Sequence, residues 1–105
     1  MDKGFPTHVG SILEKLLGRS QYKRKFQEAR LVNLWSEIVG PNLHRHTYPS
    51  HFSRGRLTCT VDNSALLNEL QYMKKDIIQK IEEKTQKRMV KDIYFVVGVI
   101  PETST

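Results

Sequence analysis

Three histidines in a short stretch, His44, His46 and His51, come closest to the spacing of a metal site. The pattern H-x-H-x4-H could bring three imidazoles together from a turn and a strand. Zinc sites, however, complete four ligands or leave one position to water, with the ligands oriented by further hydrogen bonds. No Asp, Glu or second Cys lies nearby, and Cys59 is expected to point into the core. We therefore expect no metal, and surface or capping roles for the histidines.

Residues that could catalyse a reaction are also poorly placed. Cys59 lies in the middle of an apolar stretch, where a thiol behaves as a small hydrophobic group. Glu82 and Glu83 are adjacent on an expected helix and cannot face one another as an acid–base pair. The glycines form neither a P-loop nor a G-x-G-x-x-G motif. We predict that the protein is not an enzyme and takes neither a cofactor nor a small-molecule substrate.

Basic residues are the remaining candidates. The net charge is +6, and residues 1–56 hold ten lysines and arginines against four acids, whereas residues 57–105 are balanced. A one-sided surplus favours a polyanionic partner, although many small domains are basic for no specific purpose. Glu28 and Glu37 alone could pair these cations within residues 19–56. The predicted nucleic-acid-binding residues are Lys23, Arg24, Lys25, Arg30, Arg45, Arg54 and Arg56; Tyr48 and Phe52 are expected to face the core.

Length and composition limit the class of protein. A chain of 105 residues with 38% hydrophobic and 27% charged residues suits one modest core. No apolar run reaches the roughly 18 residues that a membrane span requires, and no signal peptide is visible. A single cysteine suits a reducing compartment. We expect a cytoplasmic protein with no membrane partner.

Apolar periodicity predicts three helices. The first is short and ends before Gly18, the second covers residues 22–39 and is stopped by Gly40 and Pro41, and the third runs from 64 to about 86. Asp62, Asn63 and Ser64 are candidate N-caps for the third. The first helix carries an apolar stripe of Val9, Ile12, Leu13, Leu16 and Leu17. We favour packing of this stripe on the domain's own sheet, with docking of a second protein as the alternative.

Alternating residues predict a hairpin of residues 48–53 and 56–62 around Arg54 and Gly55. A two-residue loop would pair Phe52 with Leu57, Ser50 with Cys59 and Tyr48 with Val61, all on one face. Since arginine suits a positive-φ position poorly, a longer loop stays open. The continuous apolar run within residues 90–99 predicts a strand buried on both faces.

The element order is therefore α-α-β-β-α-β, which predicts an α+β fold with a three-stranded mixed sheet and helices packed against it. We expect a flexible arm over residues 1–7, one domain over 8–99 and a polar tail over 100–105. The expected core comprises Trp35, Leu43, Phe52, Leu57, Val61, Leu70, Ile77, Ile81 and Phe95.

From Leu34 onward the chain resembles the DciA family, once known only as a domain of unknown function. The pattern that carries the resemblance is Trp35-x3-Val39-Gly40-x2-Leu43-x2-His46-Thr47-x-Pro49, then Gly55-x-Leu57-x-Cys59-x-Val61, Ser64, Glu69-Leu70 and residues 93–98. It covers roughly two-thirds of the chain. The resemblance implies a K-homology-like fold and an adaptor in DNA replication that assists loading of the replicative helicase DnaB onto single-stranded DNA.

Two departures qualify what the resemblance implies. K-homology domains grip single strands with a G-x-x-G loop, which this sequence lacks, so that binding mode is not expected. Only about five residues follow the last expected strand, so contact with the helicase is expected through the domain face or residues 1–21. The alternative function is a stand-alone RNA-binding module that uses the same basic face.

Overall fold

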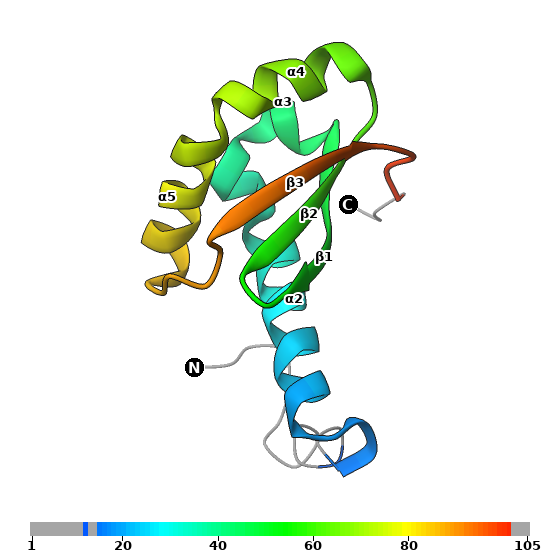
Figure 1. The fold of residues 1–105 in the computed structure, drawn as a ribbon, viewed down its shortest axis with the longest axis vertical. Helices are drawn as coiled ribbons and strands as arrows, with labels where there is room; N and C mark the ends of the chain where they lie inside the picture. The colour runs from blue at the N-terminus through cyan, green and yellow to red at the C-terminus, as the bar shows by residue number, and fades with distance from the viewer. Residues whose placement is uncertain (1–11, 13–14, 102–105) are drawn as a thin grey trace.

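The computed structural model of the protein describes residue 12 and residues 15–101 (Figure 1). Between residues 19 and 97 the elements are α2 (Arg19–Val39), α3 (Pro41–His44), β1 (Thr47–Ser53), β2 (Arg56–Val61), α4 (Ser64–Tyr72), α5 (Lys74–Thr85) and β3 (Asp92–Val97). The strands form one sheet in the order β1-β2-β3, with β1 and β2 antiparallel and β2 and β3 parallel. The predicted α+β class with a three-stranded mixed sheet is confirmed. The expected arm, residues 1–7, lies outside the described residues, as do residues 102–105 of the expected tail.

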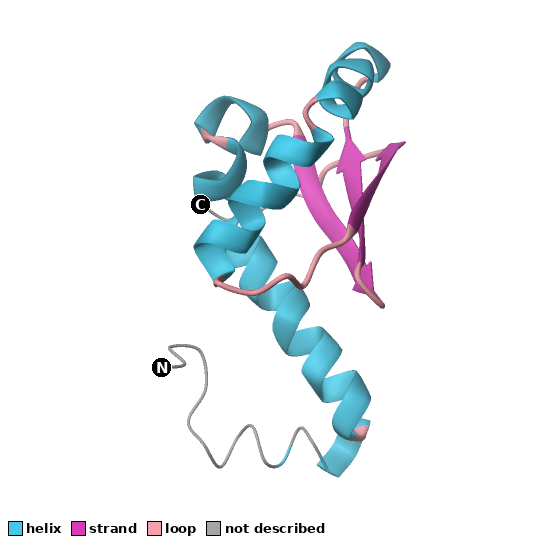
Figure 2. Cartoon of the chain, turned by 60° about the vertical axis from the view of Figure 1, so that its left-hand side comes forward, coloured by secondary structure: helices cyan, strands magenta, loops and turns pink. Residues whose placement is uncertain are grey.

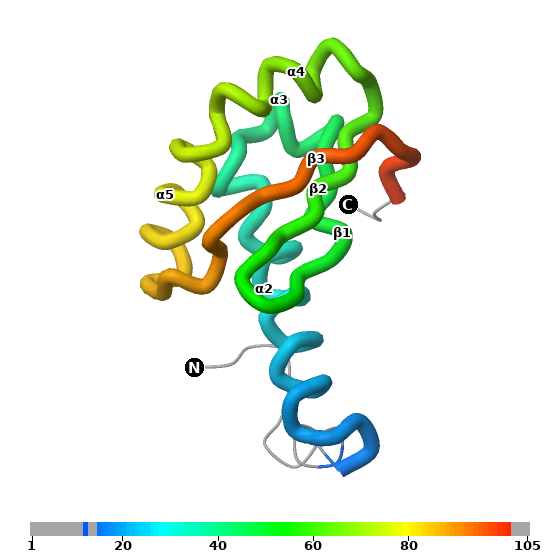
Figure 3. Tube along the Cα trace, in the orientation of Figure 1, coloured from blue at the N-terminus to red at the C-terminus, as the bar shows by residue number. Residues whose placement is uncertain are grey.

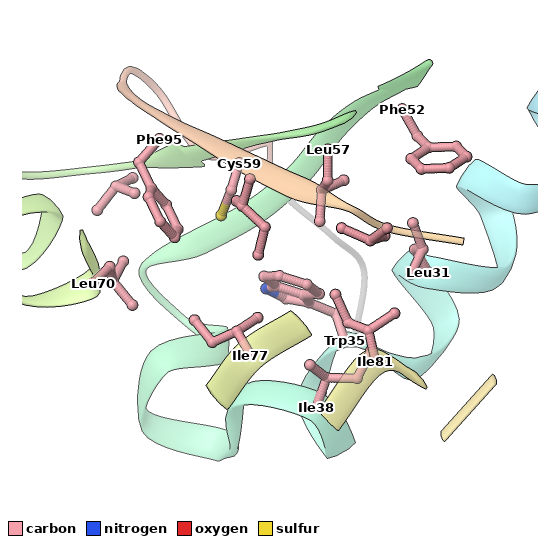
Figure 4. Packing of buried hydrophobic residues seen from close by; sticks show 13 residues of the cluster. Leu31, Trp35, Ile38, Phe52, Leu57, Cys59, Leu70, Ile77, Ile81 and Phe95 are labelled. Carbon is pink, nitrogen blue, oxygen red and sulfur yellow. The ribbon is translucent and has the colours of Figure 1, made fainter. Parts of the chain in front are cut away.

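The helices lie on one side of the sheet (Figure 2), and the core lies between the two layers. Trp35, on α2, is 1% exposed and stands at the centre of this layer (Figure 4). Eight of the nine predicted core residues are buried, and the ninth, Leu43, is partly buried and packs against them. Cys59 also faces inward, as its position in the strand predicted.

The prediction that the last strand is buried on both faces is wrong. Ile93 and Phe95 are buried, but Tyr94 between them is 60% exposed. Helices cover one face of the sheet only, so alternation along β3 turns every second side chain toward solvent. An apolar run in a strand therefore leaves an exposed aromatic ring in this fold.

The hairpin has the predicted two-residue loop, but its register changes along the strands. The observed pairs include Phe52 with Leu57, as predicted, then Pro49 with Cys59 and Thr47 with Val61. The predicted pairing of Ser50 with Cys59 and Tyr48 with Val61 is wrong because a bulge lies between Pro49 and His51. Proline has no N–H for the ladder, and Ser50 instead donates from its hydroxyl to the Thr58 carbonyl at 3.1 Å. Thr47 thereby replaces Tyr48 on the core face.

The long helix expected after the hairpin is two helices, α4 and α5, which meet at Met73. Met73 has φ −97° and ψ 2°, outside the helical range, and its N–H bonds to the Leu70 carbonyl at 3.0 Å. Leu70 before the bend and Ile77 after it are both buried in the same core. The bend thus lets the chain arch over the sheet, as the tube in Figure 3 shows.

The helix ends follow the capping residues of the sequence. Gly40 ends α2 with φ +91°, a conformation that glycine adopts without steric cost, and Pro41 begins α3. Of the three candidate N-caps, Asn63 caps α4, because its side chain accepts the Leu66 N–H at 2.8 Å. These ends fix where β1 and β2 enter and leave the sheet.

Three residues of the apolar stripe are described, and all are exposed; Leu16 reaches 75%. Packing of the stripe on the domain's own sheet is therefore wrong for Ile12, Leu16 and Leu17, since α2, α4 and α5 already fill the covered face. Val9 and Leu13 lie outside the described residues. Within the described part of the chain, no helix combines the length and apolarity needed to cross a bilayer.

Candidate nucleic-acid interface

The first turns of α2 carry the densest run of positive charge. In Figure 1 this part of the helix extends past the sheet, beyond the hairpin tip. Lys23 and Lys25 are exposed, and Arg24 is half-buried with its Nε buried and without a hydrogen-bond partner. Cations on flexible side chains at an exposed helix end can follow a phosphate backbone.

The hairpin tip carries two further cations. Arg54 and Gly55 form the turn with φ +52° and +81°, and Arg54 and Arg56 are both exposed. Neither arginine has an ion-pair partner among residues 15–101. A surface hollow of about 420 Å³ opens beside the tip; its lining residues are His51, Ser53, Arg54, Arg56 and Thr58.

Glu28 of α2 joins the helix to the hairpin. Its Oε2 accepts the Phe52 N–H at 2.9 Å and lies 3.3 Å from Nδ1 of His51, while its Oε1 lies 3.8 Å from Nζ of Lys25. A carboxylate that binds a backbone N–H of the edge strand holds β1 against α2. The two basic groups, from residues 23–25 and 54–56, are therefore fixed at the same end of the molecule.

Two of the seven predicted basic residues lie elsewhere. Nη2 of Arg30 donates to the Thr85 carbonyl at 3.4 Å, so this side chain caps the C-terminus of α5. Arg45 precedes the end of the ladder where Thr47 pairs with Val61, opposite the end where Ser53 pairs with Arg56. Five residue steps of about 3.3 Å each along β2 separate these ends by about 17 Å. The structure groups Lys23, Arg24, Lys25, Arg54 and Arg56, and leaves Arg30 and Arg45 apart.

The three histidines do not converge. Nδ1 of His46 lies 2.8 Å from Oδ2 of Asp62, and His51 contacts Glu28 near the other end of β1. Nδ1 of His44 is buried without a hydrogen-bond partner. No group of three or more His, Cys, Asp or Glu side chains suited to a metal occurs within the part of the chain that is described.

Among the described residues, two groups have shifted pKa values, and both lie away from the basic residues of α2 and the hairpin tip. Burial raises the pKa of the Cys59 thiol to about 12, which makes it a poor nucleophile near neutral pH. The hydrogen bond from His46 lowers the pKa of the Asp62 carboxyl. The Asp62 pair ties the start of β1 to the end of β2 and serves the fold.

Tyr94 is a surface residue that the sequence did not single out. It is 60% exposed between the buried Ile93 and Phe95, which places it on the uncovered face, opposite Thr58 in the β2–β3 register. Thr58 in turn lies opposite His51 and lines the hollow beside the hairpin tip. Alternation within β3 gives the direction of Tyr94, opposite to Ile93 and Phe95, but its exposure depends on the absence of helices from that face.

Comparison with known proteins identifies similar chains. The family described as "Dna[CI] antecedent, DciA" matches residues 8–95. A UPF0232 protein of Corynebacterium glutamicum (strain R) is 26% identical over 85 residues, which cover 81% of this chain and 48% of that protein. UPF0232 proteins of Mycobacterium leprae (strain Br4923) and Mycobacterium ulcerans (strain Agy99) are each 24% identical over 72% of this chain, or 40% and 41% of their own lengths. The chain thus spans less than half the length of these relatives.

Proposed function

Because the chain belongs to the DciA family, we propose that it acts as an adaptor in DNA replication that helps load the replicative helicase DnaB onto single-stranded DNA. The family match over residues 8–95 is the observation that carries this proposal. An adaptor brings two partners together and needs no catalytic group of its own. The proposed role belongs to the cytoplasm.

The basic cluster, Lys23, Arg24, Lys25, Arg54 and Arg56, supports contact with DNA. Its arginines on the hairpin lack ion-pair partners in residues 15–101, so they reach a phosphate without breaking an existing pair. Glu28 holds the two parts of the cluster together. Such contacts position a nucleic acid without reading its sequence.

The apolar stripe, Val9, Ile12, Leu13, Leu16 and Leu17, is the proposed docking element for the helicase. Its three described members are exposed, and exposed apolar groups on one segment favour contact with another protein. The stripe precedes the basic first turns of α2 directly in sequence. The helicase and the DNA would then bind close to each other, at the end of the molecule where α2 begins.

A pull-down with purified DnaB, with and without nuclease, tests the proposal. We expect DnaB to be retained after nuclease treatment, because the contact is between proteins. Deletion of residues 1–19 should abolish retention of DnaB while circular dichroism shows a folded domain and binding to oligothymidylate persists. Loss of DnaB on nuclease treatment, together with stronger binding to oligouridylate, would instead favour a stand-alone RNA-binding module.

The substitution L16E is a milder form of the same test. It places a charge at a side chain that is 75% exposed, so the fold should be unaffected. V99E, at another exposed apolar residue, is the matched control. If L16E and the deletion both retain DnaB at the level of the full chain, the stripe is not the docking element.

A further inference from the structure

We propose that the uncovered face of the sheet binds single-stranded nucleic acid by stacking a base on Tyr94 while Arg54 and Arg56 contact the adjacent phosphates. This inference rests on the proposed function and assigns its nucleic-acid site. It adds Tyr94, which would contact a base, to the lysines and arginines of the basic cluster, which would contact only phosphates.

The uncovered face presents side chains in rows across the three strands. The middle row is Thr58 and Tyr94, with His51 beside Thr58 at the edge of β1, where it also contacts Glu28. Thr58 is small and half-buried, whereas Tyr94 is 60% exposed. The exposed phenol ring therefore has a small side chain, Thr58, as its neighbour in the row. An exposed aromatic ring on a sheet is a stacking platform that any base can use.

The charge next to this ring suits a polyanion. The hollow of about 420 Å³ that Thr58 helps to line also contains Arg54 and Arg56. The acid nearest in register is Asp92, opposite Arg56, and its Oδ1 lies 3.4 Å from Nζ of Lys74. Lys74 therefore offsets the negative charge of Asp92 beside Arg56. Phosphates that follow a base stacked on Tyr94 would meet the two unpaired arginines.

The backbone at Arg54 supports a role for its charge. A φ of +52° is a left-handed conformation, which asparagine and glycine adopt more readily than arginine. The position therefore carries a residue that is unfavourable for the turn but projects a cation at the mouth of the hollow. R54N separates the two effects, since it suits the turn and removes the charge.

An exposed tyrosine ring beside two arginines should bind a single strand more tightly than a duplex. In a duplex the base faces are stacked on their neighbours, and a tyrosine on a broad sheet cannot reach them. In a single strand the bases are free, and each stacked base contributes enough to change affinity about tenfold or more. A duplex would gain only the phosphate contacts.

Fluorescence anisotropy with two labelled probes of equal length tests the inference: oligothymidylate, and an oligonucleotide whose sites lack bases. We expect the full chain to bind oligothymidylate about tenfold more tightly than the abasic probe. Y94L should remove this difference and leave binding to the abasic probe unchanged. Y94F, which keeps the ring, should behave as the unaltered protein. R54N and R56A should weaken binding to both probes.

Tyr72 supplies the matched control. It is 91% exposed on α4, away from the row that contains Thr58. Y72L removes a tyrosine ring that is more exposed than that of Tyr94 and should leave the preference for oligothymidylate intact. Loss of that preference in Y72L but not in Y94L would overturn the assignment.

The remaining outcomes separate this inference from the proposed function. If the full chain binds both probes equally and Y94L has no effect, the stacking site is wrong while phosphate binding stands. If the full chain binds neither probe, both the site and the DNA contact of the proposed function are wrong. A dimer in size-exclusion chromatography that Y94R converts to a monomer would assign the face to a second copy of the chain and overturn the inference.

Discussion

The indole N–H of Trp35 donates a hydrogen bond of 2.8 Å to the hydroxyl oxygen of Thr47, which itself donates to the Leu43 carbonyl at 2.7 Å. The relay connects α2, α3 and β1 inside the core, where Trp35 and Thr47 are buried. Burial of Trp requires a partner for its polar edge. The relay accounts for why the sequence pattern combines a tryptophan on the helix with a threonine at the entry to the first strand.

Thr47→Val should destabilise the fold by about 1–3 kcal/mol, because it leaves the buried indole N–H without an acceptor. Valine has nearly the same shape, so packing is preserved. Urea denaturation followed by Trp35 fluorescence measures the change. Thr47→Ser, which keeps the hydroxyl, should lose less stability. Equal stability of Thr47→Val and the unaltered protein would show that the relay contributes nothing.

The core was predictable from the sequence because its members recur at helical or strand spacing. Trp35, Leu70 and Ile77 each belong to a periodic stripe, and the structure buries all three. Gly40 followed by Pro41 likewise marked the end of α2 correctly. Residue spacing within one helix or strand and the residue types at a helix end determine these features, so a short stretch of sequence is enough to predict them.

Features that depend on distant parts of the chain were not predictable. Nothing within β3 indicates that one of its faces lacks a helix, which is what exposes Tyr94. The contact between Glu28 and the Phe52 N–H joins residues 24 positions apart and brings two basic groups together. The bulge at Ser50 and the bend at Met73 depend on how each segment meets the core. Such arrangements follow from tertiary packing rather than from spacing.

The hydrogen bond between His46 and Asp62 predicts a dependence of stability on pH. It lowers the pKa of Asp62 below its ordinary value, so the folded form favours the ionised carboxylate. The contribution is present above the ordinary pKa and is lost as the pH falls through the lowered one. We expect the urea midpoint to fall between about pH 5 and pH 3, and to fall less in Asp62→Asn. Glu69→Gln, at an exposed carboxyl on α4, is the control; a response equal to that of Asp62→Asn would argue against a specific pair.

Cys59 should resist thiol reagents in the folded protein. Its side chain is fully buried, and burial raises the pKa of the thiol to about 12, so the reactive thiolate is scarce near neutral pH. Reaction with Ellman's reagent should be slow in buffer and rapid in guanidinium chloride. Fast labelling of the folded protein would show that β2 opens readily.

The first turns of α2 should supply part of the salt dependence of DNA binding. Each phosphate that a protein cation neutralises releases counterions, so log affinity falls with log salt by about 0.7 per contact on a single strand. Replacing Lys23, Arg24 and Lys25 with Ala should weaken binding uniformly across sequences and reduce that slope by about 2 if all three contact phosphates. The matched control is Lys80→Ala, Lys84→Ala and Lys87→Ala on and after α5, which removes the same charge from another surface. Lys80 and Lys84 lie beside Glu83 and Glu37, so this triple variant should change the slope little. Equal losses in the two variants would mean that net charge alone governs binding and that the start of α2 is not part of the interface.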